Sequence, residues 1–129
     1  MPESAARAIH AELLAEHGGL PGPAHEASLQ SALTRARQLY AYTKPRRTLA
    51  RLAAGYTYGI ARGHCFPDGN KRLALAVLDV FLQLNGSELQ AGEPEAVDVM
   101  RALAAGELSE EASAAWIAAN SSLIENPDW

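Results

Sequence analysis

The sequence predicts an all-α protein, built as a compact bundle of about six helices around a central apolar helix at about residues 70–84. In several stretches, apolar residues recur at the spacing of one helix face. No stretch shows the convincing alternation of apolar and polar residues that indicates a half-buried strand. The chain has 129 residues, of which 48% are hydrophobic, so we expect a single domain over residues 1–129 with one core.

Three helices are predicted in the first half of the chain, at residues 4–17, 28–42 and about 49–62. Each carries a stripe of apolar residues at helical spacing, and core packing is the expected role of these stripes. Gly18 and Gly19 end the first helix, because glycine is a common helix stop.

The second half is predicted to contain the central helix and two more. The segment 70–84 is apolar on nearly all sides, which marks a helix surrounded by others, and Asn70 is expected to cap its N-terminus. Residues 87–91 are extended at most. Further helices are expected at residues 94–106 and 110–120, the first because proline suits an opening turn and the second because a serine precedes two glutamates.

Charge and composition argue against nucleic acid as a direct partner. The formal net charge is −4, and no basic face dominates. Basic residues gather in one short cluster, made of Lys44, Arg46, Arg47 and Arg51. The cluster lacks interleaved aromatic residues, so we expect it to be a solvated surface.

The sequence carries no sign of secretion or membrane insertion. Residues 1–20 lack an apolar run with basic flanks, and residues 73–84 are too few to cross a bilayer. Cys65 is the sole cysteine, which excludes an internal disulfide and a cysteine-based metal site. We therefore expect a cytoplasmic protein with no membrane partner.

The densest polar chemistry lies in residues 64–72, His-Cys-Phe-Pro-Asp-Gly-Asn-Lys-Arg, immediately before the central helix. Pro67 and Gly69 disfavour a continuous helix, so the segment should form a turn at the helix N-terminus. At that end the backbone N–H groups and the helix dipole favour an anion. Lys71 and Arg72 add two cations in the first turn, which suits a bound phosphate.

Two other side chains complete a candidate site for phosphate transfer. His64 is the nearby group that can take a proton near neutral pH. Asp68 is a hard oxygen ligand of the kind that Mg²⁺ takes together with a substrate's phosphates. Singly, each residue has an ordinary structural explanation, but a structural turn has no use for the histidine and both cations. Jointly they indicate transfer of a phosphate-containing group to a hydroxyl.

The segment resembles the H-x-F-x-(D/E)-(G/A)-N-(K/G)-R signature of the Fic/Doc superfamily, and in particular its Doc ("death on curing") toxin branch. Lys71 stands where Fic adenylyltransferases have a glycine, and Leu75 stands where they have a second arginine. Both departures follow the Doc pattern. Further similarity, in order along most of the chain, is found at residues 18–22, 61–63, 81–86 and 104–107.

The resemblance implies a toxin of a type II toxin–antitoxin system, which moves the γ-phosphate of ATP to a hydroxyl of a protein target. It implies ATP as co-substrate, Mg²⁺ as the metal, and translation elongation factor Tu as the target, so that translation and growth stop. It also implies a cognate antitoxin whose disordered segment folds onto the toxin.

The resemblance assigns roles to individual residues of this chain. His64 would be the general base on the target hydroxyl, Asp68 would hold Mg²⁺, and Phe66 would anchor the loop, with Cys65 a spectator. The nucleotide phosphates would be bound by Gly69, Asn70, Lys71 and Arg72. Arg62 is a further phosphate-binding candidate because of its position, two residues before His64. A flap that presents the target would include Leu20, Pro21 and Gly22.

Three alternatives remain open from the sequence. A Fic-type adenylyltransferase would transfer AMP, although Lys71 fills space that the inner phosphates would need and Leu75 removes a cation. A non-catalytic binding module of a toxin–antitoxin complex would occupy a partner without turnover, although the polar set is intact. A helical scaffold would carry the motif by chance.

Overall fold

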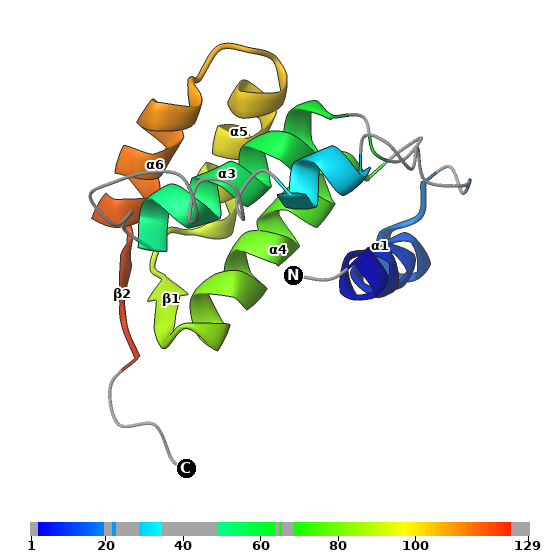
Figure 1. The fold of residues 1–129 in the computed structure, drawn as a ribbon, viewed down its shortest axis with the longest axis horizontal. Coiled ribbons are helices and arrows are strands. Elements are labelled where there is room, and N and C mark those ends of the chain that lie inside the picture. Colours follow the sequence, from blue (N-terminus) through cyan, green and yellow to red (C-terminus); the bar gives the residue numbers. More distant parts are fainter. Residues whose placement is uncertain are drawn as a thin grey trace.

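The structure is a computed structural model that describes residues 3–19, 22, 29–34, 49–63, 65 and 69–124. Its helices are α1 (Glu3–His17), α3 (Leu49–Arg62), α4 (Asn70–Leu84), α5 (Glu93–Ala104) and α6 (Glu110–Ala119), and residues 29–34 are also helical (Figure 1). This arrangement confirms the predicted all-α fold. None of the helices in the described ranges is long and apolar enough to cross a membrane.

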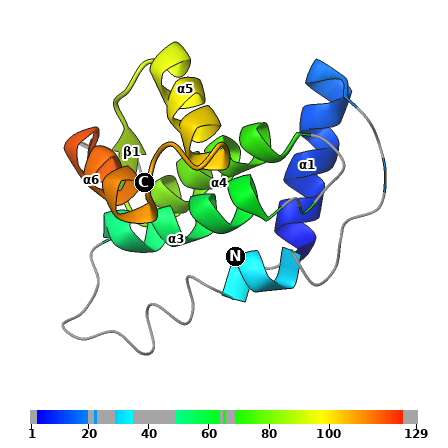
Figure 2. The ribbon, with the colours of Figure 1, turned by 90° about the horizontal axis from the view of Figure 1, so that it is seen from above.

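The centre of the bundle is formed by α3 and α4, which lie side by side (Figure 2). α4 also packs against α1, α5 and the strand β1 (Ser87–Leu89), whereas α3 also packs against α5 and α6. The fully buried residues of α4 are Leu73, Ala74, Val77, Leu78 and Leu82. The apolar helix 70–84 is therefore central, as predicted, but it shares that position with α3.

Packing around α3 depends on one aromatic residue and one glycine. Tyr56 is buried, and its ring centroid lies 5.1 Å from that of Phe81 on α4. A Cβ on Gly59 would lie only 2.8 Å from the Cα of Ala32, so glycine lets the helical residues 29–34 approach α3 closely. Tyr56 is thus a core residue, as expected of the apolar stripe predicted for residues 49–62.

Two short strands join the C-terminal end of α4 to the end of α6. β1 pairs antiparallel with β2 (Ser121–Leu123), with Ser87 opposite Leu123 and Leu89 opposite Ser121. The extended character of this part of residues 87–91 was predicted, but its partner was not. Three residues with the sequence Ser-Ser-Leu carry too little alternation to indicate a strand.

The predicted stop after α1 agrees with the structure, whereas the predicted cap of α4 does not. Gly18 and Gly19 follow α1 with φ of 76° and 127°, as expected of helix stops. The prediction that Asn70 caps α4 is wrong, because Gly69 is the N-cap and Asn70 is the first helical residue. Gly69 has φ 81° and no side-chain cap bond, so the chain enters α4 from a left-handed conformation that glycine adopts readily.

The basic cluster predicted to be solvated contains one residue that is not. The side chain of Arg51 on α3 is 16% exposed and forms an ion pair with that of Glu110, which is 4% exposed. Its Nη2 also lies 3.6 Å from Oε1 of Glu111. The prediction is therefore wrong for Arg51, because the packing of α6 on α3 covers it. The other three members, Lys44, Arg46 and Arg47, lie outside the described residues.

Candidate active site

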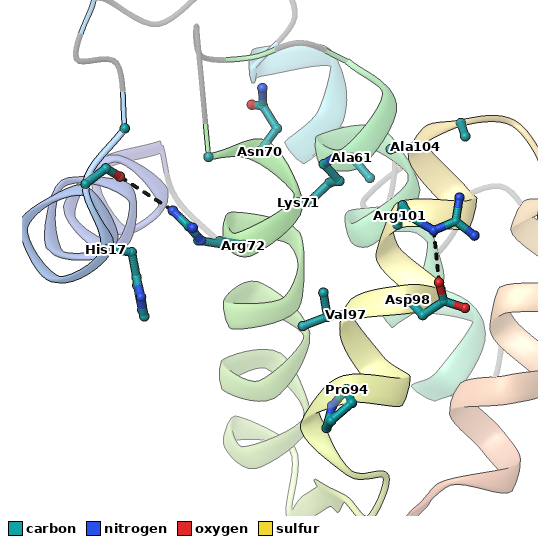
Figure 3. Close-up of a pocket in the computed structure, with 14 residues that line it drawn as sticks. His17, Ala61, Asn70, Lys71, Arg72, Pro94, Val97, Asp98, Arg101 and Ala104 are labelled. Carbon is teal, nitrogen blue, oxygen red and sulfur yellow. Dashed lines mark hydrogen bonds and ion pairs between the residues drawn. The ribbon is translucent and has the colours of Figure 1, made fainter.

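The first turn of α4 opens into a pocket of about 920 Å³ (Figure 3). The pocket is lined by the end of α1, the first turn of α4 and one face of α5. Four of the five residues predicted to bind phosphate line it, namely Gly69, Asn70, Lys71 and Arg72. The structure thus brings together residues that the sequence placed at one helix end, and it supplies a space beside them.

The other predicted site residues fall mostly outside the described part of the chain. The predicted base His64, the anchor Phe66 and the metal ligand Asp68 lie outside it, as do Leu20 and Pro21 of the predicted flap. Gly22 is described and is exposed. The roles of these residues remain predictions, and the site is described from the residues that flank them.

Gly69 and the first turn of α4 form the helix end that the sequence predicts to bind an anion. The helix starts with the Leu73 N–H donating to the Gly69 carbonyl at 2.9 Å. The first turn contains no acidic residue, and it carries Lys71 and Arg72, both exposed. The positive charges of these two side chains add to the positive end of the helix dipole, and like charges repel one another. An anion bound at this turn would offset that repulsion, so the turn is a favourable place for one.

The two cations reach different walls of the pocket. Arg72 extends toward α1 and donates to the Gly18 carbonyl at 3.5 Å, which is a long and therefore weak hydrogen bond (Figure 3). Lys71 lies on the side of Ala61, the pocket residue contributed by α3 (Figure 3). Lys71 and Arg72 could therefore each contact a different phosphate group of a nucleotide bound in the pocket.

Arg62, the fifth predicted phosphate ligand, is placed at the turn that follows α5. Its Cζ lies 5.7 Å from the centroid of the Tyr58 ring, a cation–π distance. A Cβ on Gly106 would lie 3.3 Å from Arg62 Nη1, so the guanidinium rests on that glycine. This position is set by Tyr58 and Gly106, and a role in phosphate binding stays a prediction.

The α5 wall of the pocket was not foreseen from the sequence. Asp98 Oδ1 accepts a hydrogen bond from Arg101 Nε at 2.9 Å, and Glu107 Oε2 accepts one from Arg101 Nη1 at 3.0 Å. The hydrogen bonds to Asp98 and Glu107 and the charges of these two groups raise the pKa of Arg101. The wall therefore carries one carboxylate, Asp98, and one cation, Arg101, opposite the cationic turn of α4, and Glu107 contacts Arg101 from beyond the end of α5. The spacing of Asp98 and Arg101, three residues apart on an exposed helix face, was the available signal.

The loop before α4 includes Cys65, the sole cysteine of the chain. Cys65 is fully buried, and burial raises the pKa of its thiol, so the protonated form is favoured and a spectator role is supported.

Among the residues that the structure describes, no group of three His, Cys, Asp or Glu side chains could hold a metal ion. Mg²⁺ usually takes only one or two carboxylates beside a substrate's phosphates. The single carboxylate of Asp68, which is predicted to hold it, would therefore be enough.

Two comparisons with known proteins cover this region. The model of the Fic/DOC family matches residues 1–82, which include α1, α3 and most of α4. The protein kinase doc of Escherichia phage P1 is 34% identical over 102 residues, which span 79% of this chain and 79% of that protein. The residues matched by the family model include the loop before α4 and its first turn. This chain therefore belongs to the Fic/DOC family.

Proposed function

We propose that this protein is a Doc-like toxin that transfers the γ-phosphate of ATP to a hydroxyl of a protein target, translation elongation factor Tu. The observation that carries the proposal is the first turn of α4, where Lys71 and Arg72 line the pocket at a helix N-terminus. The similarity to a phage protein named as a protein kinase supports transfer of phosphate in particular.

In the proposed reaction His64 accepts the proton of the target hydroxyl. The hydroxyl oxygen then forms a bond to the γ-phosphorus, the bond from that phosphorus to the β,γ-bridging oxygen breaks, and ADP leaves. Lys71, Arg72 and the N–H groups at the start of α4 neutralise the charge on the phosphates. Asp68 would hold Mg²⁺, which would supply further neutralisation of the phosphate charge.

Lys71 separates the proposed kinase from the alternative of AMP transfer. A glycine at this position leaves bare backbone on which a nucleotide's inner phosphates can rest, whereas Lys71 places a side chain at the pocket wall. Leu75 one turn later supplies no second cation. Both features support attack on the terminal phosphate over attack on the α-phosphate.

The proposal includes a partner and a place of action. A cognate antitoxin would neutralise the toxin through a disordered segment that folds on it, with residues 1–129 acting as one domain. The target would be met in the cytoplasm, where translation takes place. A binding module without turnover remains the second candidate, since occupation of a partner needs no intact phosphate chemistry.

A transfer assay with purified elongation factor Tu and Mg²⁺ tests the proposal. ATP labelled on the γ-phosphate should label the target, ATP labelled on the α-phosphate should not, and His64→Ala should abolish the transfer. Glu88→Gln, on β1 at the opposite end of α4, is the control that should keep full activity. Label from the α position would instead establish AMP transfer. Growth inhibition that survives His64→Ala, with no label transferred, would favour the binding module.

A further inference from the structure

A buried histidine on α1 lies directly against the start of α4. His10 is 4% exposed. A Cβ on Gly69 would lie 3.2 Å from His10 Nε2 and 3.9 Å from Leu14 Cδ2. The imidazole therefore packs on the bare Cα of the residue that caps α4, at the edge of the loop that carries the motif.

Gly69 controls how the phosphate-binding turn begins. Its φ of 81° is open to glycine at little cost, and its carbonyl accepts the first hydrogen bond of α4, from the Leu73 N–H. Lys71 follows two residues later, so a shift of Gly69 would redirect both the backbone N–H groups and this cation. The position of Gly69 is thus a condition for the geometry of the pocket.

Packing alone does not account for a histidine at this place on α1. The neighbouring residues of the same helix face, Ala6, Ile9 and Leu13, are apolar and belong to the core or pack against it. A buried polar ring costs free energy unless its nitrogen atoms have polar partners, so a histidine at this place serves polar contacts as well as packing. The imidazole has its Nε2 edge at the glycine that starts α4.

A second link joins α1 to the same turn. The carbonyl of Gly18, just after the last residue of α1, accepts the hydrogen bond from Arg72. The helix therefore meets the first turn of α4 at two points, one buried at His10 and one exposed at Gly18. The buried contact is the one that a bound phosphate would not replace.

We propose that His10 is a positioning residue, which holds Gly69 and through it the phosphate-binding turn of α4 in the geometry that transfer requires. Its effect on the reaction rests on the proposed function. Its effect on the turn does not, because the contact between His10 and Gly69 is independent of any substrate.

Three variants test this role. His10→Ala removes the ring, and His10→Gln keeps a polar atom near the place of Nε2. Leu13→Ala is the matched control, because Leu13 lies on the same helix face and packs against the core without being among the side chains near Gly69. For each variant we would measure thermal stability, kcat and KM for ATP, and hydrogen exchange of the Leu73 amide.

We expect His10→Ala to lower kcat at least tenfold more than Leu13→Ala, with a smaller effect on KM, and His10→Gln to restore part of the rate. The Leu73 amide should exchange at least tenfold faster in His10→Ala than in Leu13→Ala, after correction for global stability. Equal exchange in the two variants would overturn the inference. If the wild type transfers no phosphate, the proposed function fails, and the exchange rates still decide the role of His10. If His10→Ala does not fold, His10→Gln is compared with Leu13→Ala in the same way, and exchange no faster than in Leu13→Ala overturns the inference.

Discussion

The N-termini of α6 and α4 solve the same physical problem in opposite ways. At the start of α6, Ser109 Oγ accepts a hydrogen bond from the Ala112 N–H at 3.0 Å. Glu110 and Glu111 then place negative charge in the first turn, where the helix dipole favours it. The α6 end is therefore stabilised by its own side chains.

The start of α4 has none of these features. Gly69 provides no side-chain cap, the first turn has no acidic residue, and Lys71 and Arg72 place positive charge against the dipole. Relative to α6, this turn forgoes roughly 2–3 kcal/mol of local stabilisation. An anion bound in the pocket would restore that stabilisation, which is why the difference points to a phosphate site.

The largest expected effect is on the reaction itself. Lys71→Ala should reduce phosphate transfer by about 10²–10³-fold, because the turn loses a charge that would neutralise the transferred group. Its thermal stability should stay the same or rise slightly, since an unfavourable cation leaves the helix N-terminus. Steady-state kinetics and a melting curve check both parts. A variant that keeps the wild-type rate, or that loses activity only by unfolding, would contradict the comparison.

At the N-terminus of α6, by contrast, a substitution should lower stability rather than activity. Arg51→Ala should lower the free energy of unfolding by about 3 kcal/mol, because it removes the guanidinium that pairs with the buried carboxylate of Glu110. Arg101→Ala is the matched control, since its partners Asp98 and Glu107 are exposed and exposed pairs contribute less than about 1 kcal/mol. Urea unfolding measures both, and equal losses would contradict the distinction.

The cap of α6 should account for a smaller amount. Ser109→Ala should lower the free energy of unfolding by about 1 kcal/mol, because the Ala112 N–H loses its acceptor. Ser4→Ala, an exposed serine within α1, should change it by less than about 0.5 kcal/mol. Urea unfolding of the two variants gives the answer, and a neutral Ser109→Ala would show that α6 does not depend on its cap.

The smallest effect concerns a charge inside α4. Burial raises the pKa of the Asp79 carboxyl, so the folded state binds this proton more readily than the unfolded state. The contribution of Asp79 to stability therefore falls as pH rises through the window between the two pKa values. Asp79→Asn should raise stability at pH 7 by less than about 1 kcal/mol, and by less still near pH 4. Melting curves at both values check the sign; a loss of stability at pH 7 would contradict it.

Local signals were sufficient for most of the helices. The predicted bounds of α3 and α4 agree with the structure, and α1 begins one residue before its predicted start. In each case an apolar stripe and a glycine, proline or asparagine at the end act within a few residues, so the sequence alone contains the information. The same holds for Ser109 as the cap of α6.

The motif was also readable as a local feature. Lys71 and Arg72 were placed in the first turn of α4 from the breakers before them, and the structure has them there. The prediction that Asn70 caps α4 was wrong by one residue, because Gly69 begins the helix in a left-handed conformation without a side-chain cap.

What the sequence determined by itself was the order of the helices and the presence of the Fic/DOC motif at one helix end, because both depend on residues close together in the chain. The tertiary structure alone decided which distant residues meet. The contact of His10 with Gly69, the pair of Arg51 with Glu110, and the α5 wall with Asp98 and Arg101 all depend on how the helices pack. Such contacts follow from the crossing of helix faces, which no local pattern specifies.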